Sequence, residues 1–277
     1  MRILHPTDFS EASNKALAVA RMLRDLLGGE LVLLHAIEYP VRSKVYGDYW
    51  DEMLSKTFEE RRRELIAYLT EKLRELEPGA RHVIDEGKPL SVILKHAKEA
   101  DLVAMGTHGP EGLLERLLGS VTERVIELSG KPVVATKAEA EVRPFKHLVV
   151  ATGLAEPSKR ALELAKRIAD AAGARITLLH AVEPIPEPPI PVHMPDPHEV
   201  LGGDYMEKLA KELAKIAEPY GAEPVIREGD PVEVLCRFAK EEQADAVFIG
   251  RSKEARFLGS VTREVLERAG LPVFVHP

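Results

Sequence analysis

The sequence is poor in cysteine and in aromatic residues. Its 277 residues include one cysteine, Cys236, one tryptophan, and 5% aromatic residues in all. A single cysteine excludes an internal disulfide framework and favours a reducing compartment, so we expect a cytoplasmic protein. No apolar run approaches the roughly 20 residues that span a bilayer, and Met1–Asp8 has no apolar segment of signal-peptide length. We therefore expect no membrane partner.

The sequence also lacks an excess of positive charge. Lysine and arginine number 38 against 45 aspartate and glutamate, which gives a net charge of −7 and a pI near 5.9. A nucleic-acid surface usually makes its domain strongly basic, so we expect no nucleic-acid partner. With 45% hydrophobic and 30% charged residues, the composition is typical of a globular protein, and the length suffices for two domains with separate cores.

Three signatures of nucleotide chemistry are absent. The sequence has no G-x-x-x-x-G-K-[ST] with its phosphate-binding lysine, no kinase-type catalytic loop, and no G-x-G-x-x-G after a first strand. Fast phosphoryl transfer needs positioned positive charge and a group that orients the nucleophile. We therefore expect at most slow hydrolysis of a nucleotide, for which a bound Mg²⁺ would suffice because it polarises phosphate by itself.

A repeat is the most informative feature that is present. LVLLHAIE at Leu31–Glu38 matches ITLLHAVE at Ile176–Glu183, with five of eight positions identical. GSVTERVIELSGKPVVA from Gly119 matches GSVTREVLERAGLPVFV from Gly259, with nine of seventeen identical. The matches occur in the same order in both halves, which indicates a duplication.

The duplication predicts two tandem domains, over residues 1–137 and 147–277, joined by a charged linker at 138–146. In each half, continuous Val/Leu/Ile runs alternate with amphipathic segments, as in a parallel sheet that is buried on both faces. The predicted fold class is α/β: two tandem doubly wound (Rossmann-like) domains, each a five-stranded parallel sheet flanked by helices. In such sheets, ligands bind beyond the carboxyl ends of the strands.

Local signals mark the elements of the first half. Ser10 is a suitable N-cap for a first helix, Pro89 suits the first turn of another, and Ser120 with Glu123 predicts a capping box. The strands expected are Arg2–Pro6, Glu30–Ile37, Arg81–Asp85, Asp101–Gly106 and Pro132–Thr136.

A glycine-rich segment follows the fourth expected strand. Gly106 and Gly109 enclose two residues, and after nine more residues Gly119 and Ser120 open a helix. Glycine lets the backbone approach phosphate oxygens closely, and free N–H groups at a helix start favour an anion by about 0.3–1 kcal/mol. The hydroxyls of Ser120 and Thr122 add donors. The alternative is a structural turn, but the position after a buried strand and before a helix favours a phosphate site.

Together with this loop, ILHPTDFSEAS, LVLLHAIE, DLVAMGTHG and GSVTERV followed by KPVV resemble the tandem type of the universal stress protein family. The resemblance implies an adenine nucleotide, ATP or a relative, with Mg²⁺ bridging its phosphates. It implies Pro6, Thr7, Asp8 and Ala36 around the adenine, Met105, Gly106, Thr107, His108 and Gly109 around the ribose and phosphates, and Gly119, Ser120, Val121 and Thr122 on the phosphate chain. It also implies that the fifth strands pair edge to edge, as an internal pseudo-dimer of the two halves.

The second half departs from this pattern. Gly153 stands where the first half has Asp8, and Ala151 replaces Pro6. After Gly250, eight residues without a further glycine lead to Gly259, four fewer than in the first half. We therefore expect one nucleotide per chain, held by the first half as a regulatory or stress-response ligand.

Several alternatives stay open at this point. Asp8 suits a helix cap as well as an adenine contact. The strand histidines His35 and His180 occupy equivalent positions in both halves, which favours a structural role. The chain is alternatively a slow Mg-dependent ATPase or phosphotransferase, or a nucleotide-free interaction module. A further homodimer is also open, with Tyr46, Tyr49 and Trp50 as a candidate surface, while His193 and His198 favour a solvated loop over a metal site.

Overall fold

The computed structural model describes residues 1–38, 51–107, 119–183, 205–251 and 257–277. In the first half, strands alternate with helices in the predicted order. The elements are β1 (Arg2–Pro6), α1 (Glu11–Leu27), β2 (Glu30–Ile37), α2 (Asp51–Leu76), β3 (Arg81–Glu86), α3 (Pro89–Ala97), β4 (Leu102–Gly106), α4 (Ser120–Leu128) and β5 (Val133–Thr136).

The second half repeats this order. Its elements are β6 (His147–Ala151), α5 (Glu156–Ala172), β7 (Arg175–Val182), α7 (Tyr205–Ala217), a short 3-10 turn η2 (Glu218–Tyr220), β8 (Glu223–Glu228), α8 (Pro231–Glu241), β9 (Ala246–Gly250), α9 (Ser260–Arg268) and β10 (Val273–His276). Among the described residues, no helix is long and apolar enough to cross a membrane.

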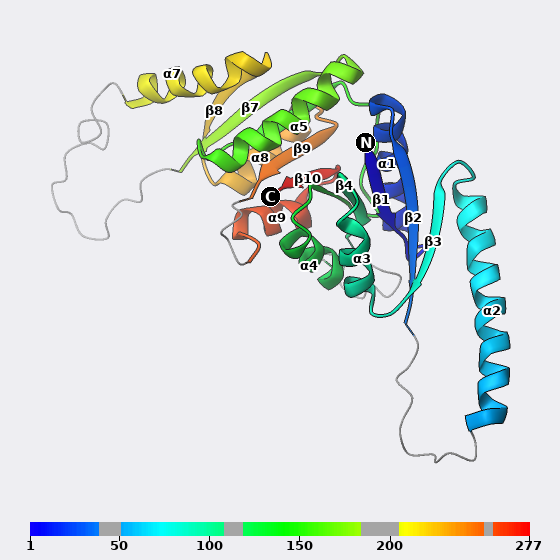
Figure 1. Cartoon of the computed structure of the whole chain (residues 1–277). Coiled ribbons are helices and arrows are strands. Elements are labelled where there is room, and N and C mark those ends of the chain that lie inside the picture. The colour runs from blue at the N-terminus through cyan, green and yellow to red at the C-terminus, as the bar shows by residue number, and fades with distance from the viewer. Residues whose placement is uncertain (39–50, 108–118, 184–204, 252–256) are drawn as a thin grey trace, which may run out of the picture.

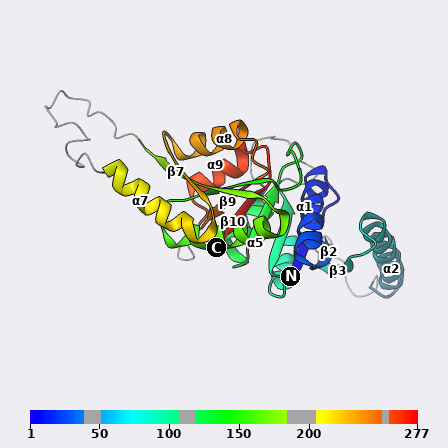
Figure 2. The same cartoon turned by 90° about the horizontal axis from the view of Figure 1, so that it is seen from above.

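The ten strands form one sheet in the order β3-β2-β1-β4-β5-β10-β9-β6-β7-β8. Neighbouring strands within each half run parallel, whereas β5 and β10 pair antiparallel. The predicted α/β fold and the edge-to-edge pairing of the fifth strands are both confirmed. The two five-stranded sheets therefore continue into each other at the centre of the molecule, and α2 and α7 lie at its opposite ends (Figures 1 and 2).

Helices cover both faces of this sheet, and each face has its own core. One core packs α3, α4, α8 and α9 against the strands, and the other packs α1, α5 and the buried sides of α2 and α7 against the opposite face. Successive strand residues point to opposite faces, so Ile3 belongs to the second core and its neighbour Leu4 to the first. Because inner strands such as β4 and β9 are buried on both faces, their sequences are continuously apolar.

Two of the three helix starts predicted from local signals are confirmed as predicted. Ser10 caps α1 by accepting a hydrogen bond from the Ser13 amide, and Pro89 is the first residue of α3. The predicted capping box at Ser120 is wrong. Gly119 is the N-cap of α4 and makes no side-chain cap bond, and Glu123 instead pairs with an arginine of the second half.

Residues 138–146 lie against the second half. Ala140 and Phe145 are buried, and the Glu141 amide donates to the Gly270 carbonyl at 2.9 Å. Arg143 lies with Nε 3.3 Å from a carboxylate oxygen of Asp245. The segment therefore contributes to packing, although its charged composition is typical of a solvated connection.

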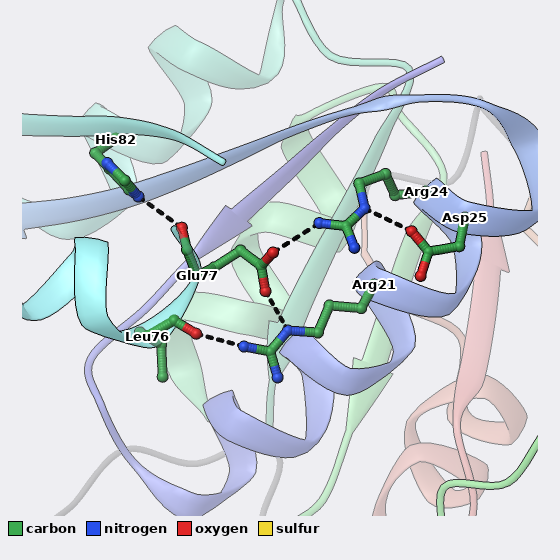
Figure 3. A network of polar contacts seen from close by, with 6 residues as sticks. All are labelled: Arg21, Arg24, Asp25, Leu76, Glu77 and His82. Carbon is green, nitrogen blue, oxygen red and sulfur yellow. Dashed lines mark hydrogen bonds and ion pairs between the residues drawn. The ribbon is translucent and has the colours of Figure 1, made fainter. Parts of the chain in front are cut away.

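A network of charged side chains ties α1 to the end of α2 (Figure 3). Arg24 donates from Nη1 to Glu77 Oε1 at 2.7 Å, and Arg21 donates to the other carboxylate oxygen. The Glu77 carbonyl in turn lies 2.8 Å from Nε2 of His82, on β3. Burial alone would raise the pKa of Glu77, but the hydrogen bonds from Arg24 and Arg21 outweigh it and lower that pKa. The network thus fixes where α2 ends and β3 begins.

Candidate functional site

A pocket of about 300 Å³ opens at the carboxyl ends of β1, β2 and β4, beside the start of α4. The strand β1 lies between β2 and β4. The chain passes from β1 to β2 through α1 on one face of the sheet, and from β3 to β4 through α3 on the opposite face. This is the switch point at which doubly wound sheets bind ligands. Its lining is Pro6, Thr7, Asp8, Ser13, Leu34, His35, Ala36, Pro89, Ile93, Met105, Gly106, Thr107, Gly119, Ser120, Val121 and Thr122.

All predicted site residues within the described part of the chain line this pocket. They are Pro6, Thr7, Asp8, Ala36, Met105, Gly106, Thr107, Gly119, Ser120, Val121 and Thr122. His108 and Gly109 lie outside the described residues, as do the candidate surface at Tyr46, Tyr49 and Trp50 and the histidines His193 and His198. Five further lining residues were not predicted as site residues: Ser13, Leu34, His35, Pro89 and Ile93. Ser13 and Ile93 come from helices, whose facing is set by packing.

The turn after β1 is held by hydrogen bonds within itself and by one to β2. The Thr7 amide donates to the Leu34 carbonyl at 2.8 Å, and Asp8 Oδ1 accepts from the Ser10 amide at 2.9 Å. Phe9 adopts a left-handed conformation with φ of 63°, and its amide donates to Thr7 Oγ1 at 3.0 Å. Asp8 therefore braces the turn without being the N-cap, and its contact with an adenine stays a prediction.

Beneath the pocket lies a chain of buried polar groups. Nδ1 of His5 is 2.9 Å from the Ala104 carbonyl, so this nitrogen carries the proton, because a carbonyl only accepts. Nε2 is then an acceptor for the Ser13 hydroxyl, 3.3 Å away, and Ser13 Oγ lies 2.9 Å from Thr7 Oγ1. Burial lowers the pKa of His5 to about 4, so the ring is neutral at pH 7. The histidine thereby fixes two hydroxyls that line the pocket.

The start of α4 faces the same pocket. The Gly119 amide donates to the Thr107 carbonyl at 2.5 Å, and the Thr122 hydroxyl donates to the Gly106 carbonyl at 2.7 Å. These two bonds close the end of β4 onto the first turn of the helix. The N-cap Gly119 has no side chain with which to cap α4. The first N–H groups of the helix also have no intrahelical partner, so they suit an anion.

Gly106 has a packing role that its place in the loop did not reveal. A Cβ at this residue would lie 2.6 Å from the Ser13 amide nitrogen and 2.7 Å from the Ala12 carbonyl carbon. Its counterpart Gly250 is more tightly enclosed, at 2.0 Å from the Pro157 carbonyl oxygen. Both glycines therefore allow a helix to pack closely against the fourth strand of their half, and this role does not depend on any ligand.

The pocket has little charge within the described residues. Neither a lysine nor an arginine lines it there, Asp8 is its one carboxylate, and Nδ1 of His35 is 2.8 Å from the Thr7 carbonyl. His180 makes the same contact with Thr152 at 2.8 Å, so the structural role expected for this histidine pair is confirmed. No group of three potential metal ligands occurs among the described residues. Within that part of the chain, the pocket offers hydroxyls and backbone amides rather than a catalytic cation.

In the second half, different residues occupy the corresponding place. Arg251 follows β9 where Thr107 follows β4, and its guanidinium donates to the Glu127 carbonyl of α4 at 3.3 Å. The Leu258 amide donates to the Glu127 carboxylate at 2.9 Å. The end of the second half's shorter loop is thus bonded to the first half.

A larger groove, of about 810 Å³, runs beside α8 and α9 in the second half, away from the strand ends of the first. Its lining includes Glu233, Cys236, Arg237 and Lys240 of α8. Burial raises the pKa of the Cys236 thiol, so the thiolate is disfavoured.

Comparison with known proteins agrees with this architecture. The model of the universal stress protein family matches residues 1–137 and again residues 144–277. The chain belongs to the universal stress protein family. Universal stress protein MJ0577 of Methanocaldococcus jannaschii is 37% identical over 155 residues, which cover 49% of this chain and 94% of that protein. A universal stress protein of Thermus aquaticus is 29% identical over 146 residues, 47% of this chain and 98% of its own length.

A relative with the full tandem length is known structurally. The crystal structure of a universal stress protein from Archaeoglobus fulgidus covers 99% of this chain and 97% of its own, with a TM-score of 0.68 and 24% identity. At that identity the likeness shows the shared fold. The single-unit relatives, by contrast, each match about half of this universal stress protein.

Proposed function

We propose that this universal stress protein binds one adenine nucleotide, ATP, in the pocket of its first half, and holds it as a regulatory ligand of the cytoplasmic stress response. The observation that supports this proposal most is that a single pocket contains both an apolar part and the start of α4, where the N-cap Gly119 makes no side-chain cap bond. The apolar part is lined by Leu34, Ala36, Ile93 and Met105. The apolar part suits a base, and the helix start suits phosphates. Its volume lies at the lower end of the range of small-molecule sites.

A Mg²⁺ ion fits this site only together with the phosphates. The ion prefers oxygen ligands and is usually held by one or two carboxylates with substrate phosphates, and Asp8 is the one carboxylate in the described lining. Asp8 or the hydroxyls of Ser120 and Thr122 would hold the ion or its waters. When bound, Mg²⁺ would neutralise phosphate charge; the described lining supplies no further cation, which supports retention of the nucleotide over rapid turnover.

Two matched glycine variants test the proposal. Gly119, at φ −60° and ψ 131°, and Gly259, at φ −63° and ψ 151°, both precede the last helix of their half in a conformation open to any residue. We expect Gly119→Val to place a side chain at the phosphate end of the pocket and abolish binding. Gly259→Val should leave binding unchanged, since nothing lies within 4 Å of a Cβ at Gly259.

The readout is the nucleotide released from the purified, denatured protein, measured by chromatography and expressed per chain. We expect one ATP per chain in the native protein and in Gly259→Val, and none in Gly119→Val. Calorimetric titration with Mg·ATP then checks any sample that carries none. Two nucleotides per chain, loss of binding in Gly259→Val, or no binding by the native protein would contradict the proposal, and bound ADP would favour slow hydrolysis.

A further inference from the structure

The junction between the two halves has an internal two-fold symmetry in its register. At an offset of 140 residues, Val134 of β5 and Phe274 of β10 occupy the same position of the repeat. These two residues are paired with each other at the junction. The flanking pairs are Ala135 with Val273 and Val133 with Val275. The pseudo-two-fold axis therefore passes between Val134 and Phe274.

A residue on a two-fold axis meets its own copy whenever two like halves associate. At this junction a small side chain meets a large one instead. Phe274 is buried and stacks on Phe248, with ring centroids 4.3 Å apart. The centroid of the Phe145 ring lies 6.3 Å from that of Phe274, with the two rings in an edge-type arrangement. Two copies of Phe274 would compete for this space, and two copies of Val134 would leave part of it empty, both of which destabilise a packed interface.

A charge pair beside the axis shows the same asymmetry. Glu123 of α4 and Arg263 of α9 also occupy one repeat position, and the sequence inverts there from Glu-Arg to Arg-Glu. Arg263 donates from Nη1 to Glu123 Oε2 at 2.8 Å, with a second hydrogen bond from Nη2 to Oε1. Association of like halves would bring two glutamates or two arginines together at this place, which disfavours the wrong partner.

The contacts of Glu127 are a third asymmetric feature. Its side chain is 2% exposed and accepts from Arg124 at 2.6 Å and from the Leu258 amide at 2.9 Å. The Leu258 amide belongs to the loop that is four residues shorter than its counterpart in the first half. The shortened loop therefore contacts the opposite half at a buried carboxylate.

We propose that the β5–β10 junction selects the opposite half of the same chain and rejects a second copy of its own half. The residues that make the selection are the axis pair Val134 and Phe274 and the charge pair Glu123 and Arg263. The duplicated halves thus pair with each other within one chain, and neither β5 nor β10 is left to pair with a like half of another chain.

The test removes the covalent connection after folding. A protease site is inserted at Glu139, whose side chain is 59% exposed. The folded full-length protein is cut there and incubated until its halves have had time to exchange partners. Native mass spectrometry then counts mixed pairs, which contain one half of each kind, and like pairs, which contain two copies of one half. The variants are Glu123→Arg, Glu123→Gln and the exchange Glu123→Arg with Arg263→Glu.

We expect the cut native protein to form mixed pairs far above the random proportion. In Glu123→Arg, every possible pairing brings two arginines together, so the ratio of mixed to like pairs should fall at least about tenfold. The exchanged double variant should recover the native ratio of mixed to like pairs. The ratio for Glu123→Gln should lie between those of the native protein and Glu123→Arg, and this variant has no repulsion between residues 123 and 263 that could affect folding. Random pairing or separation of the native halves, or an unchanged ratio in Glu123→Arg, would overturn the proposal.

Discussion

Replacing His5 with valine should make the protein less sensitive to acid. His5 is fully buried on β1, with its ring between the Ala104 carbonyl and Ser13. Burial disfavours the charged ring, and the pKa falls from 6.5 to about 4 in the folded protein. Valine is a fair replacement, because Val150 occupies the equivalent buried position in the second half.

The sign of the effect follows from proton binding. Between pH 6.5 and 4 the unfolded chain holds a proton on His5 and the folded chain does not, so acid favours unfolding. The stability is fully present above pH 6.5 and is lost as the pH falls towards 4. Since one pKa unit corresponds to about 1.4 kcal/mol, the full loss is about 3 kcal/mol, and about 2.5 kcal/mol of it is reached by pH 4.5.

The assay is urea unfolding of both proteins at pH 7 and pH 4.5. His5→Val lowers stability at pH 7 through its smaller side chain, so the informative quantity is the loss between the two pH values. Other groups contribute to this loss, among them His147, whose pKa is also lowered by burial, but they contribute equally to both proteins. The native protein should lose about 2.5 kcal/mol more than the variant. Equal losses would refute the neutral, buried state assigned to His5.

Two further substitutions test the packing that positions the site. Glu77→Gln should lower the free energy of unfolding by about 1–2 kcal/mol, because it weakens hydrogen bonds to two arginines in a largely buried place. The control Glu71→Gln, in an exposed ion pair, should change the free energy of unfolding by less than about 0.5 kcal/mol. Equal effects of the two substitutions in urea titrations would contradict the role given to the network. Gly106→Ala should cost about 2–4 kcal/mol, because its Cβ meets backbone at 2.6 Å. Gly153→Ala, with nothing within 4 Å of its Cβ, should be nearly neutral in thermal unfolding, and similar melting temperatures for the two variants would argue against the close helix–strand contact.

The features that were predicted correctly depend on neighbours in the sequence. Ser10 caps a helix through an amide three residues away, and Pro89 needs only the first turn of its own helix. The repeat and the alternation of strands and helices likewise follow from the order of residues along the chain. The family resemblance added the pairing of the fifth strands, which periodicity alone does not specify.

The features that were missed depend on residues far away in the sequence. Glu123 has the spacing of a capping box, but its partner Arg263 is 140 residues further on and belongs to another helix. Gly106 has the spacing of a phosphate loop, yet α1 requires a glycine there for its own packing. Ser13 lines the pocket because of the angle at which α1 crosses β4. Composition and spacing carry no information on such contacts.

The asymmetry of the junction gives the second half a structural role that does not depend on whether it binds a nucleotide. Alone, the first half would leave β5 as an exposed sheet edge, which invites unwanted association, and would leave Glu127 without its bond from Leu258. The second half removes both problems through β10 and its shortened loop. Leu258 ends a loop that is four residues shorter than its counterpart in the first half, and its amide donates to the buried Glu127 carboxylate of α4. The second half therefore supports α4, whose first turn lines the pocket of the first half.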